Sequence, residues 1–405
     1  NLIILKKTAS YVLKIKERAG KIEEIKGSDI NIEIAIDDKL KELMDTQNTF
    51  RWVYPILTKS KDSIELEVIY DKELLLNNIE SLLCLKSENI IEPSNPIFIY
   101  DNFNYTVLEE VMGNKIDKDK LIKVIEQAVK SLNTEIDLEV LGCYINPKYS
   151  KNSQKTIDTL EKLNKYVSTK ITYIHGDRSI SVDGNVINGF LMVNENLDII
   201  IDEDKVNEYI NELSKKINTV GKSRRFTTTL GKIITVSGGD YGWSIDKKAE
   251  ANNLISAIKD GITDTAQPIF KQTALFSGPN DIGDTYVEID LTNQHIWYYK
   301  NGKLIIDGNI VSGNLKNDNA TPKGVYSLKR KSTNVVLRGP DYAVPVKYWM
   351  PFNGGIGIHD AEWRKKFGGD IYRTNGSRGC INTPLNVSKA IYENIEVGTP
   401  IVCYY

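Results

Sequence analysis

Two hydrophobic periodicities divide this chain of 405 residues into an upstream part that mixes helices with strands and a downstream part that is mainly strand. Along 286–291, apolar and polar residues alternate, as in a strand with one buried face. A second β-prone run, 296–299, ends at Asn301-Gly302, and a third run follows. Asn-Gly between two such runs is a strong hairpin signal. Residues 283–405 are therefore predicted to form one mainly-β domain.

Upstream of this domain the apolar residues recur at helical spacing, and the pattern occurs twice. In each half, an aspartate suited to an N-cap precedes an amphipathic run at two places. These aspartates are Asp71 and Asp117 in the first half, and Asp202 (or Asp204) and Asp246 in the second. The offsets are nearly equal, at 131 from 71 to 202 and 129 from 117 to 246. Two copies of one α+β unit are predicted.

The pattern gives a multidomain organisation, with duplicated α+β modules before the mainly-β domain. Residues 1–28 are polar and are predicted to form a helical stalk or linker remnant. The first module is expected at 29–150 and the second at 151–277. A stretch rich in glycine and proline, 278–283, is the clearest linker and leads into 283–405.

Composition excludes several classes of protein. Apolar residues make up 41% and charged residues 26%, which is ordinary for globular domains. With 52 basic and 54 acidic side chains, the net charge is −2. The chain therefore lacks the excess of positive charge that is typical of nucleic-acid-binding proteins. No apolar run reaches the 18 residues of a membrane-spanning helix. The chain begins at Asn1 rather than Met, and we expect that a targeting segment has been removed.

The cysteines and histidines do not form a metal-binding pattern. None of the four cysteines belongs to a C-x-x-C pair, and three scattered histidines supply no zinc site, so neither a metal nor a cofactor is expected. Cys84 and Cys143 are predicted to be buried thiols, and a disulfide between them is the alternative. His175 resembles a catalytic histidine turn, but no Gly-Cys follows nearby, and His295 is expected to be structural.

One motif carries the strongest chemical signal. It is the run Ser377-Arg378-Gly379-Cys380-Ile381-Asn382, which follows Gly357-Ile358-His359-Asp360. A thiol is nucleophilic as thiolate, and an imidazole can remove its proton when a third group orients the ring. Gly379 leaves room for a substrate, and backbone N–H groups near Cys380 could bind an oxyanion. The motif favours a cysteine acyl-transfer enzyme, and the alternative is a buried cysteine with a structural histidine.

This string resembles the L,D-transpeptidase family, whose YkuD-type catalytic domain carries a histidine and then Ser/Thr-His/Arg-Gly-Cys, a hydrophobic residue, and Asn or Arg. A similar Thr-Pro-x-Gly step stands at 321–324. The resemblance implies a β-sandwich or barrel-like domain with Cys380 as nucleophile and His359 as base. It also implies that the main-chain carbonyl of Asp360 orients the imidazole, so the carboxylate of Asp360 would not be required.

The resemblance extends to substrate binding. Many members have a second histidine where this chain has Arg378, whose planar fork could bind a substrate carboxylate or form a surface salt bridge. Ser377 and Asn382 are expected to shape the cysteine turn. The expected substrate-binding residues are Ser377, Arg378, Gly379, Asn382, Tyr348 and Trp363.

The resemblance implies a reaction on bacterial cell-wall peptidoglycan. Cys380 would attack the third residue of a tetrapeptide stem and expel D-Ala, and a second stem would complete a 3→3 cross-link. Stem peptides and glycan strands are the expected partners, carbapenem-type β-lactams the expected inhibitors, and the cell wall the expected location, with a membrane tether outside this chain. Three alternatives stay open: an L,D-carboxypeptidase, a sortase-like transpeptidase, and a non-catalytic wall-binding protein. The sortase-like alternative expects an arginine after the cysteine, which this chain lacks.

The second α+β copy contains Gly-Gly-Asp-Tyr-Gly-Trp at 238–243 and resembles the peptidoglycan-binding modules of clostridial and enterococcal relatives. The alternative for both modules is a spacer. Trp243 could stack on a sugar ring, or it could fill the core beside its turn.

Overall fold

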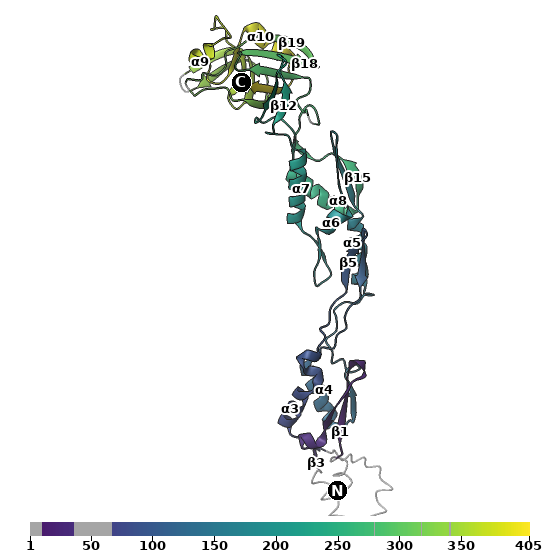
Figure 1. Ribbon diagram of the computed structural model, residues 1–405. Helices are drawn as coiled ribbons and strands as arrows, with labels where there is room; N and C mark the ends of the chain where they lie inside the picture. Colours follow the sequence, from purple (N-terminus) through teal and green to yellow (C-terminus); the bar gives the residue numbers. More distant parts are fainter. Residues whose placement is uncertain (1–9, 36–66, 279, 317, 340–341) are drawn as a thin grey trace, which may run out of the picture. The chain divides into compact units, whose positions relative to one another are not determined.

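The computed structural model describes residues 10–35, 67–278, 280–316, 318–339 and 342–405. Its contacts divide the chain into two compact units, and Figure 1 labels some of their elements. The described residues up to Asp101, together with Tyr105–Glu161 and Glu195–Leu197, belong to the first unit, and the other described residues belong to the second. Across the described part of the chain, no helix combines the length and the apolar character needed to cross a membrane.

The first unit is organised around a three-stranded sheet. Strand β1 (Val12–Lys16) pairs antiparallel with β2 (Ile22–Lys26) and parallel with β7 (Glu135–Asp137). The other strands and the helices are β3 (Glu33–Ala35), β4 (Glu67–Ile69), α3 (Lys72–Ser81), β5 (Ile97–Asp101), β6 (Asn104–Leu108) and α4 (Lys118–Lys130). Asp71 and Asp117 are the N-caps of α3 and α4, as predicted.

The prediction of a helical stalk at 1–28 is wrong for the described residues 10–28. Leu13 and Ile15 of β1 are fully buried in the core of the first unit, whereas Lys14 and Lys16 are exposed. Such alternation with period two is that of a strand, and the lysines on its solvent face give the segment its polar composition. The first module therefore begins well before residue 29, and residues 1–9 lie outside the described part.

The second unit opens with a module that repeats the same topology. Strand β8 (Lys170–His175) pairs antiparallel with β9 (Arg178–Val182) and parallel with β15 (Thr263–Ala266), as β1 does with β2 and β7. The other elements are α5 (Gln154–Val167), which crosses from the first unit, α6 (Gly184–Asn188), β10 (Leu191–Val193), β11 (Ile199–Ile201), α7 (Glu203–Ile217), β12 (Arg224–Thr227), β13 (Ile233–Val236), β14 (Ser244–Ile245), α8 (Lys247–Asp260) and β16 (Phe270–Gln272). Asp202 and Asp246 cap α7 and α8. The predicted duplication is confirmed.

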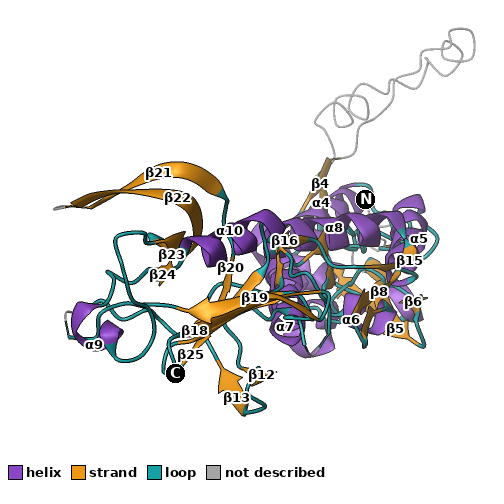
Figure 2. Ribbon diagram, turned by 90° about the horizontal axis from the view of Figure 1, so that it is seen from above, coloured by secondary structure: helices purple, strands orange, loops and turns teal. Residues whose placement is uncertain are grey.

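The C-terminal domain contains two sheets. Strands in the order β19-β18-β17-β25-β20 form the first, and β21-β22-β23-β24 form the second. These elements, with two short helices, are β17 (Tyr286–Asp290), β18 (His295–Lys300), β19 (Lys303–Asn309), β20 (Gly324–Ser327), β21 (Ser332–Gly339), β22 (Tyr342–Asn353), β23 (Ile356–Asp360), α9 (Ile371–Asn375), β24 (Ile381–Thr383), α10 (Leu385–Asn394) and β25 (Pro400–Tyr404). The predicted hairpin is confirmed by the antiparallel pairing of β17, β18 and β19. Figure 2 shows β21 and β22 as a long hairpin that projects from the domain.

The core of this domain lies between the two sheets and α10. Ile289 of β17, Met350 of β22 and Ile391 of α10 are fully buried in one apolar cluster. Cys403 of β25 belongs to the same cluster, and burial raises the pKa of its thiol. Cys84 and Cys143 are buried free thiols in the first unit, so the alternative of a disulfide between them is not realised.

The Gly-Gly-Asp-Tyr run of the second module extends the first sheet of the C-terminal domain at its edge strand β20. Val325 N–H donates to Gly238 O (3.1 Å), and Tyr241 N–H donates to Val325 O (3.1 Å). Gly239 lies between them with a φ of +81°, and a Cβ there would lie 2.0 Å from Val325 O. Only glycine permits this approach, and the pairing covers an edge that would otherwise be open.

Trp243 fills space beside this turn. Its indole Nε1–H donates to Phe276 O (2.6 Å), and its ring lies 4.6 Å from that of His175 and 4.7 Å from that of Phe270. The structure therefore favours the packing role over sugar stacking. The predicted linker is also packed, because Asp281 and Ile282 are both buried.

Candidate active site

Cys380 and His359 line one hollow of about 210 Å³ in the C-terminal domain. His359 is on β23, and Cys380 immediately precedes β24. The two strands are parallel neighbours, with His359 opposite Asn382. This pairing explains how residues 21 positions apart in the sequence reach one site. Of the predicted residues, His359, Trp363, Ser377, Arg378, Cys380 and Asn382 line the hollow.

The turn that carries the cysteine is held by side-chain hydroxyls. Ser377 Oγ–H donates to Cys380 O (2.5 Å), and Ser377 Oγ accepts from Gly379 N–H (3.1 Å). Thr321 Oγ1–H donates to Gly379 O (2.7 Å) from the opposite side. Gly379 has a φ of +109°, which side chains rarely permit. Ser377 and Gly379 thus shape the turn, and Ser377 also lines the hollow.

Cys380 is partly exposed, and its thiol is protonated at neutral pH in this site. Its Sγ–H points to Gly355 O at 3.5 Å. Burial raises the pKa of the thiol, and a hydrogen bond from the backbone of Gly357 lowers it by a smaller amount. Formation of the nucleophilic thiolate therefore requires that a base take the proton.

His359 is buried and neutral, with both ring nitrogens hydrogen-bonded. Its Nδ1 lies 2.8 Å from the main-chain carbonyl of Asp360, and its Nε2 lies 3.0 Å from Asn382 Nδ2. The carbonyl can only accept, so Nδ1 carries the proton and the lone pair is on Nε2. Burial is the main cause that lowers the pKa of the imidazole. The Asp360 carboxylate points elsewhere and accepts from the backbone N–H groups of Lys347 and Tyr348.

Arg364 is a member of the site that the sequence interpretation missed. Its Nε–H donates to Asn382 Oδ1 (2.8 Å), and its Nη1–H donates to Asn375 O (2.9 Å). The first bond directs the oxygen of the Asn382 amide away from His359 and the NH₂ group toward Nε2. Arg364 lies in a loop without periodicity, and no sequence signal places it beside Asn382.

The projecting hairpin supplies the second group of missed residues. Leu337 of β21 and Tyr342 and Val344 of β22 line the hollow, as does Gly376. The Arg378 guanidinium lies 4.7 Å from the centroid of the Tyr342 ring, which is a cation–π contact. The sequence analysis identified no element in this segment, and sequence periodicity alone does not show which side chains would reach the cysteine.

The two aromatic residues expected to bind substrate, Tyr348 and Trp363, lie differently with respect to the hollow. Trp363 lines the hollow, is 52% exposed, and its ring lies 5.9 Å from that of His359. Tyr348 is not among the residues that line the hollow, so the structure does not support its expected role in substrate binding. Side chains alternate along a strand, and Trp349 is the neighbour whose ring approaches His359, at 5.8 Å. Tyr348 packs instead on Tyr392 of α10, at 5.1 Å.

The other histidines lie outside this site. His175 is buried beside Trp243, and His295 pairs with Asp307 across the β18–β19 ladder. Within the described residues, Glu17, Glu23 and Cys84 of the first unit are the group whose potential metal-ligand atoms lie within 4.8 Å of one another. The Glu23 carboxylate already accepts from the backbone N–H groups of Leu83 and Cys84, which gives it a structural role.

Comparisons with known proteins agree with this geometry. Residues 284–403 match the family model YkuD, the L,D-transpeptidase catalytic domain, and residues 23–137 and 150–267 each match the model described as "Putative peptidoglycan binding domain". No curated protein sequence matches the chain significantly.

Among solved structures, the avibactam carbamoyl enzyme of Ldtfm is 36% identical, with 62% of this chain and 98% of that chain covered and a TM-score of 0.52. A cysteine-to-serine mutant of Enterococcus faecium L,D-transpeptidase is 35% identical, with 61% and 100% covered and the same TM-score of 0.52. The catalytic domain of the E. faecium enzyme acylated by ertapenem is 46% identical over 30% of this chain and 97% of that chain, with a TM-score of 0.28. This chain belongs to the L,D-transpeptidase family with a YkuD-type catalytic domain, and it is an L,D-transpeptidase enzyme.

Proposed function

We propose that the chain forms 3→3 cross-links between peptidoglycan stem peptides through a thioester on Cys380. The observation that supports this most directly is the presence of Cys380 and His359 in one hollow of a YkuD-type domain. The donor would be a tetrapeptide stem whose third residue is a diamino acid, and the leaving group would be the terminal D-Ala. The reaction would take place in the cell wall, outside the cell.

In the proposed acylation, the Cys380 thiol leaves Gly355 O and its proton passes to Nε2 of His359. For this transfer, Nε2 must exchange its bond with the Asn382 amide for one with the thiol. The sulfur then attacks the donor carbonyl, and the imidazolium gives the proton to the leaving D-Ala amine. Gly379 N–H is already bonded to Ser377 Oγ, so the backbone N–H of Cys380 itself is the proposed oxyanion donor.

In the proposed second half-reaction, the side-chain amine of another stem attacks the thioester and His359 accepts the amine proton. The thiol is regenerated when the carbon–sulfur bond breaks. Water in place of the amine would make the same site an L,D-carboxypeptidase, and the partial exposure of Cys380 gives water access. Arg378, at the exposed edge of the hollow, is the proposed partner of a substrate carboxylate.

We further propose that the two N-terminal modules contact peptidoglycan glycan strands, because both match the peptidoglycan-binding model. β-Lactams are proposed inhibitors. The Ldtfm structure with avibactam holds a carbamoyl enzyme, and we expect a carbapenem to acylate Cys380 in the same hollow.

The test is mass spectrometry of the chain and its Cys380→Ala variant after incubation with a disaccharide-tetrapeptide. We expect loss of D-Ala and a dimer with a 3→3 bond, both absent in the variant. D-Ala loss without dimer would identify a carboxypeptidase. No product from a folded protein, and no carbapenem adduct on Cys380, would instead favour the sortase-like or wall-binding alternatives.

A further inference from the structure

An open hollow of about 500 Å³ lies on the second module, apart from the site at Cys380. Four of the six residues that line it are cationic, and among the described residues no acidic side chain lines it. Arg178 begins β9, Lys215 and Lys216 are in the last turn of α7, and Lys222 is in the loop that follows. The other two lining residues are Ser179 and Ile180. We name this surface the basic hollow.

Two cations of the basic hollow are fixed by the C-terminal end of α7. Arg178 Nη1–H donates to Lys216 O, and Lys222 Nζ donates to Lys215 O (2.5 Å). The last carbonyls of a helix lack intrahelical partners and carry partial negative charge, so cations are stabilised there. These bonds hold both side chains at the hollow. Less side-chain conformational entropy is therefore lost when a ligand binds.

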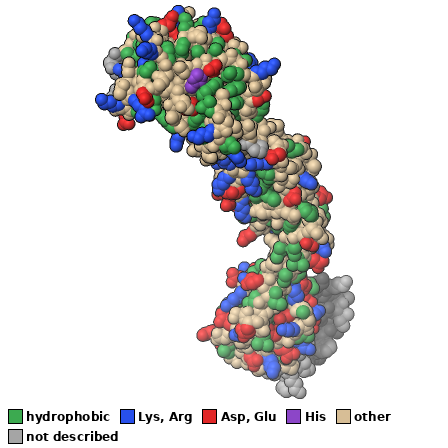
Figure 3. Space-filling model, turned by 45° about the horizontal axis from the view of Figure 1, so that its top comes forward, with side chains coloured by type: hydrophobic (Ala, Val, Ile, Leu, Met, Phe, Trp, Pro, Cys, Tyr) green, Lys and Arg blue, Asp and Glu red, His purple; other side chains and the backbone are tan. Residues whose placement is uncertain are grey.

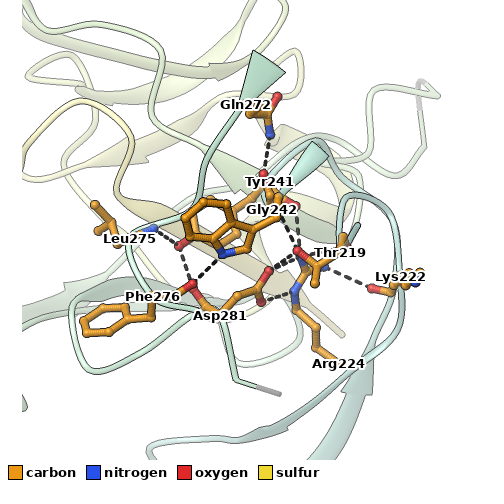
Figure 4. A network of polar contacts seen from close by, with 10 residues as sticks. Thr219, Lys222, Arg224, Tyr241, Gly242, Gln272, Leu275, Phe276 and Asp281 are labelled. Carbon is orange, nitrogen blue, oxygen red and sulfur yellow. Dashed lines mark hydrogen bonds and ion pairs between the residues drawn. The ribbon is translucent and has the colours of Figure 1, made fainter. Parts of the chain in front are cut away.

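The backbone that carries Lys222 is fixed as well. Arg224 Nη1–H donates to Lys222 O (3.0 Å), and the same guanidinium forms a buried ion pair with Asp281. Figure 4 shows this network, in which Lys222 is joined to Arg224 and Arg224 to Asp281. Asp281 precedes the C-terminal domain, so the basic hollow and the C-terminal domain share one packed network of the second unit.

Helix capping does not account for the number of cations. Two side chains cap α7, yet four line the hollow. Lys215 is paired with Glu212 (2.5 Å), whereas Arg178, Lys216 and Lys222 have no carboxylate oxygen within 4 Å among the described residues. Burial and then the charge of Arg178 lower the pKa of Lys222, as expected where like charges crowd together.

The positive charge is also a local feature, because the whole chain carries −2. In the view of Figure 3, Lys and Arg side chains lie among Asp and Glu side chains over the visible surface, so the molecule is not basic overall. A local cluster of cations on a chain with a slightly negative net charge attracts anionic ligands to this place rather than to the whole surface.

We propose that the basic hollow binds successive phosphates of a linear phosphodiester polymer, such as a chain of polyol phosphates in the cell envelope. The hollow is open and larger than a single phosphate, so several units of a polymer can lie along it. The ammonium groups of Lys216 and Lys222 act as point charges suited to phosphate oxygens, whereas bidentate recognition of a single carboxylate or phosphate would need a free guanidinium fork. The fork of Arg178 is partly occupied by Lys216 O. The Ser179 hydroxyl adds a neutral donor. This inference does not depend on the chemistry of Cys380.

The test measures binding of a fluorescent oligo(glycerol phosphate) to the full chain and to Lys216→Gln/Lys222→Gln. Neither substitution removes a backbone carbonyl of the α7 end, so the cap by Arg178 stays. The matched control is Lys170→Gln/Lys259→Gln, which removes two exposed charges from the same module. Lys170 is at the opposite end of β8 from His175 and Arg178, and Lys259 is near the end of α8 that leads into β15.

We expect the first double variant to bind roughly tenfold more weakly or worse at low ionic strength, and the control to bind like the unmodified chain. An oligoglutamate of equal charge should bind more weakly than the phosphate probe. Equal loss in both double variants, preference for the oligoglutamate, or no binding by the unmodified chain would overturn the proposal. Circular dichroism verifies the fold, and Lys216→Arg/Lys222→Arg should restore binding. D-Ala release by the unmodified chain is measured in parallel, and its absence would contradict the proposed function but not this inference.

Discussion

At the scale of single residues, the site contains a series of hydrogen bonds in which each residue donates to the next. Arg364 donates to Asn382, Asn382 donates to Nε2 of His359, and Nδ1–H of His359 donates to the carbonyl of Asp360. Because each donor fixes the next acceptor, the series selects one imidazole tautomer. The lone pair on Nε2 is the one that can accept a proton from Cys380.

Asn382→Asp tests this arrangement through pH. A carboxylate at hydrogen-bond distance favours the imidazolium, so the pKa of His359, which burial lowers in the native site, should rise. The base acts only when neutral, so the acidic limb of kcat/KM for D-Ala release should move to higher pH, by about one unit. Profiles of the unmodified chain, Asn382→Asp and Asn382→Ala provide the measurement. A limb that stays in place in Asn382→Asp would show that Asn382 does not contact the base during catalysis.

Asp360→Ala separates the carbonyl of this residue from its carboxylate. The buried carboxylate accepts from Lys347 N–H and Tyr348 N–H, so its removal should cost about 1–3 kcal/mol of folding free energy. The carbonyl that orients His359 remains, and most of the activity should remain below the unfolding temperature. Thermal unfolding and D-Ala release would be measured beside His359→Ala. A loss of activity as large as in His359→Ala, with unchanged stability, would assign the carboxylate a catalytic role.

At the scale of elements, the sequence pattern predicted those strands and helix starts that are determined by local periodicity and capping residues. Alternation identified β17 and β18, and capping aspartates identified the starts of α3, α4, α7 and α8. It failed at β1, where lysines on the exposed face of a short strand gave the composition of a polar helix. The cysteine motif predicted that Cys380 and His359 share one site, because their local sequence is constrained by the turn and the strand. Arg364 and Tyr342 were missed, since only tertiary packing brings them to the hollow.

The β21–β22 hairpin is the element whose contribution to substrate binding is open to direct test. Tyr342→Ala removes both a wall of the hollow and the ring beneath the Arg378 guanidinium, a contact worth about 0.5–1 kcal/mol at an exposed site. We expect kcat/KM for the donor stem to fall several-fold, mainly through KM, with little change in stability. Val336→Ala is the matched control, because Val336 is exposed on the same hairpin and does not line the hollow. Equal effects of the two substitutions would mean that the hairpin acts without a specific contact from Tyr342.

At the scale of the whole molecule, the division into units does not follow the division into repeats. The first module has its own core, whereas the second shares an apolar cluster with the C-terminal domain, in which Phe226 and Val236 pack with Val325 and Tyr404. The Gly-Gly-Asp-Tyr run completes this junction by pairing with β20. The Gly-Gly-Asp-Tyr run, which resembles a binding feature in the sequence, therefore joins the second module to the C-terminal domain. This role follows from the close approach of Gly239 to Val325, which the sequence alone does not reveal.

Arg224→Met tests whether the second module and the C-terminal domain unfold together. Arg224 and Asp281 form an ion pair with side chains 5% and 2% exposed, and loss of one partner leaves a buried charge, at a cost of about 3–5 kcal/mol. Arg225→Met is the control, because Arg225 is the exposed neighbour on the same strand. In scanning calorimetry of the full chain, we expect the transition of the second unit to fall by roughly 10 °C in Arg224→Met, while the transition of the first unit stays in place. The double variant Arg224→Met/Asp281→Leu should recover much of the loss, because no buried charge is left unpaired. If the C-terminal domain kept its transition in Arg224→Met while the second module lost its own, the junction would not couple their folding.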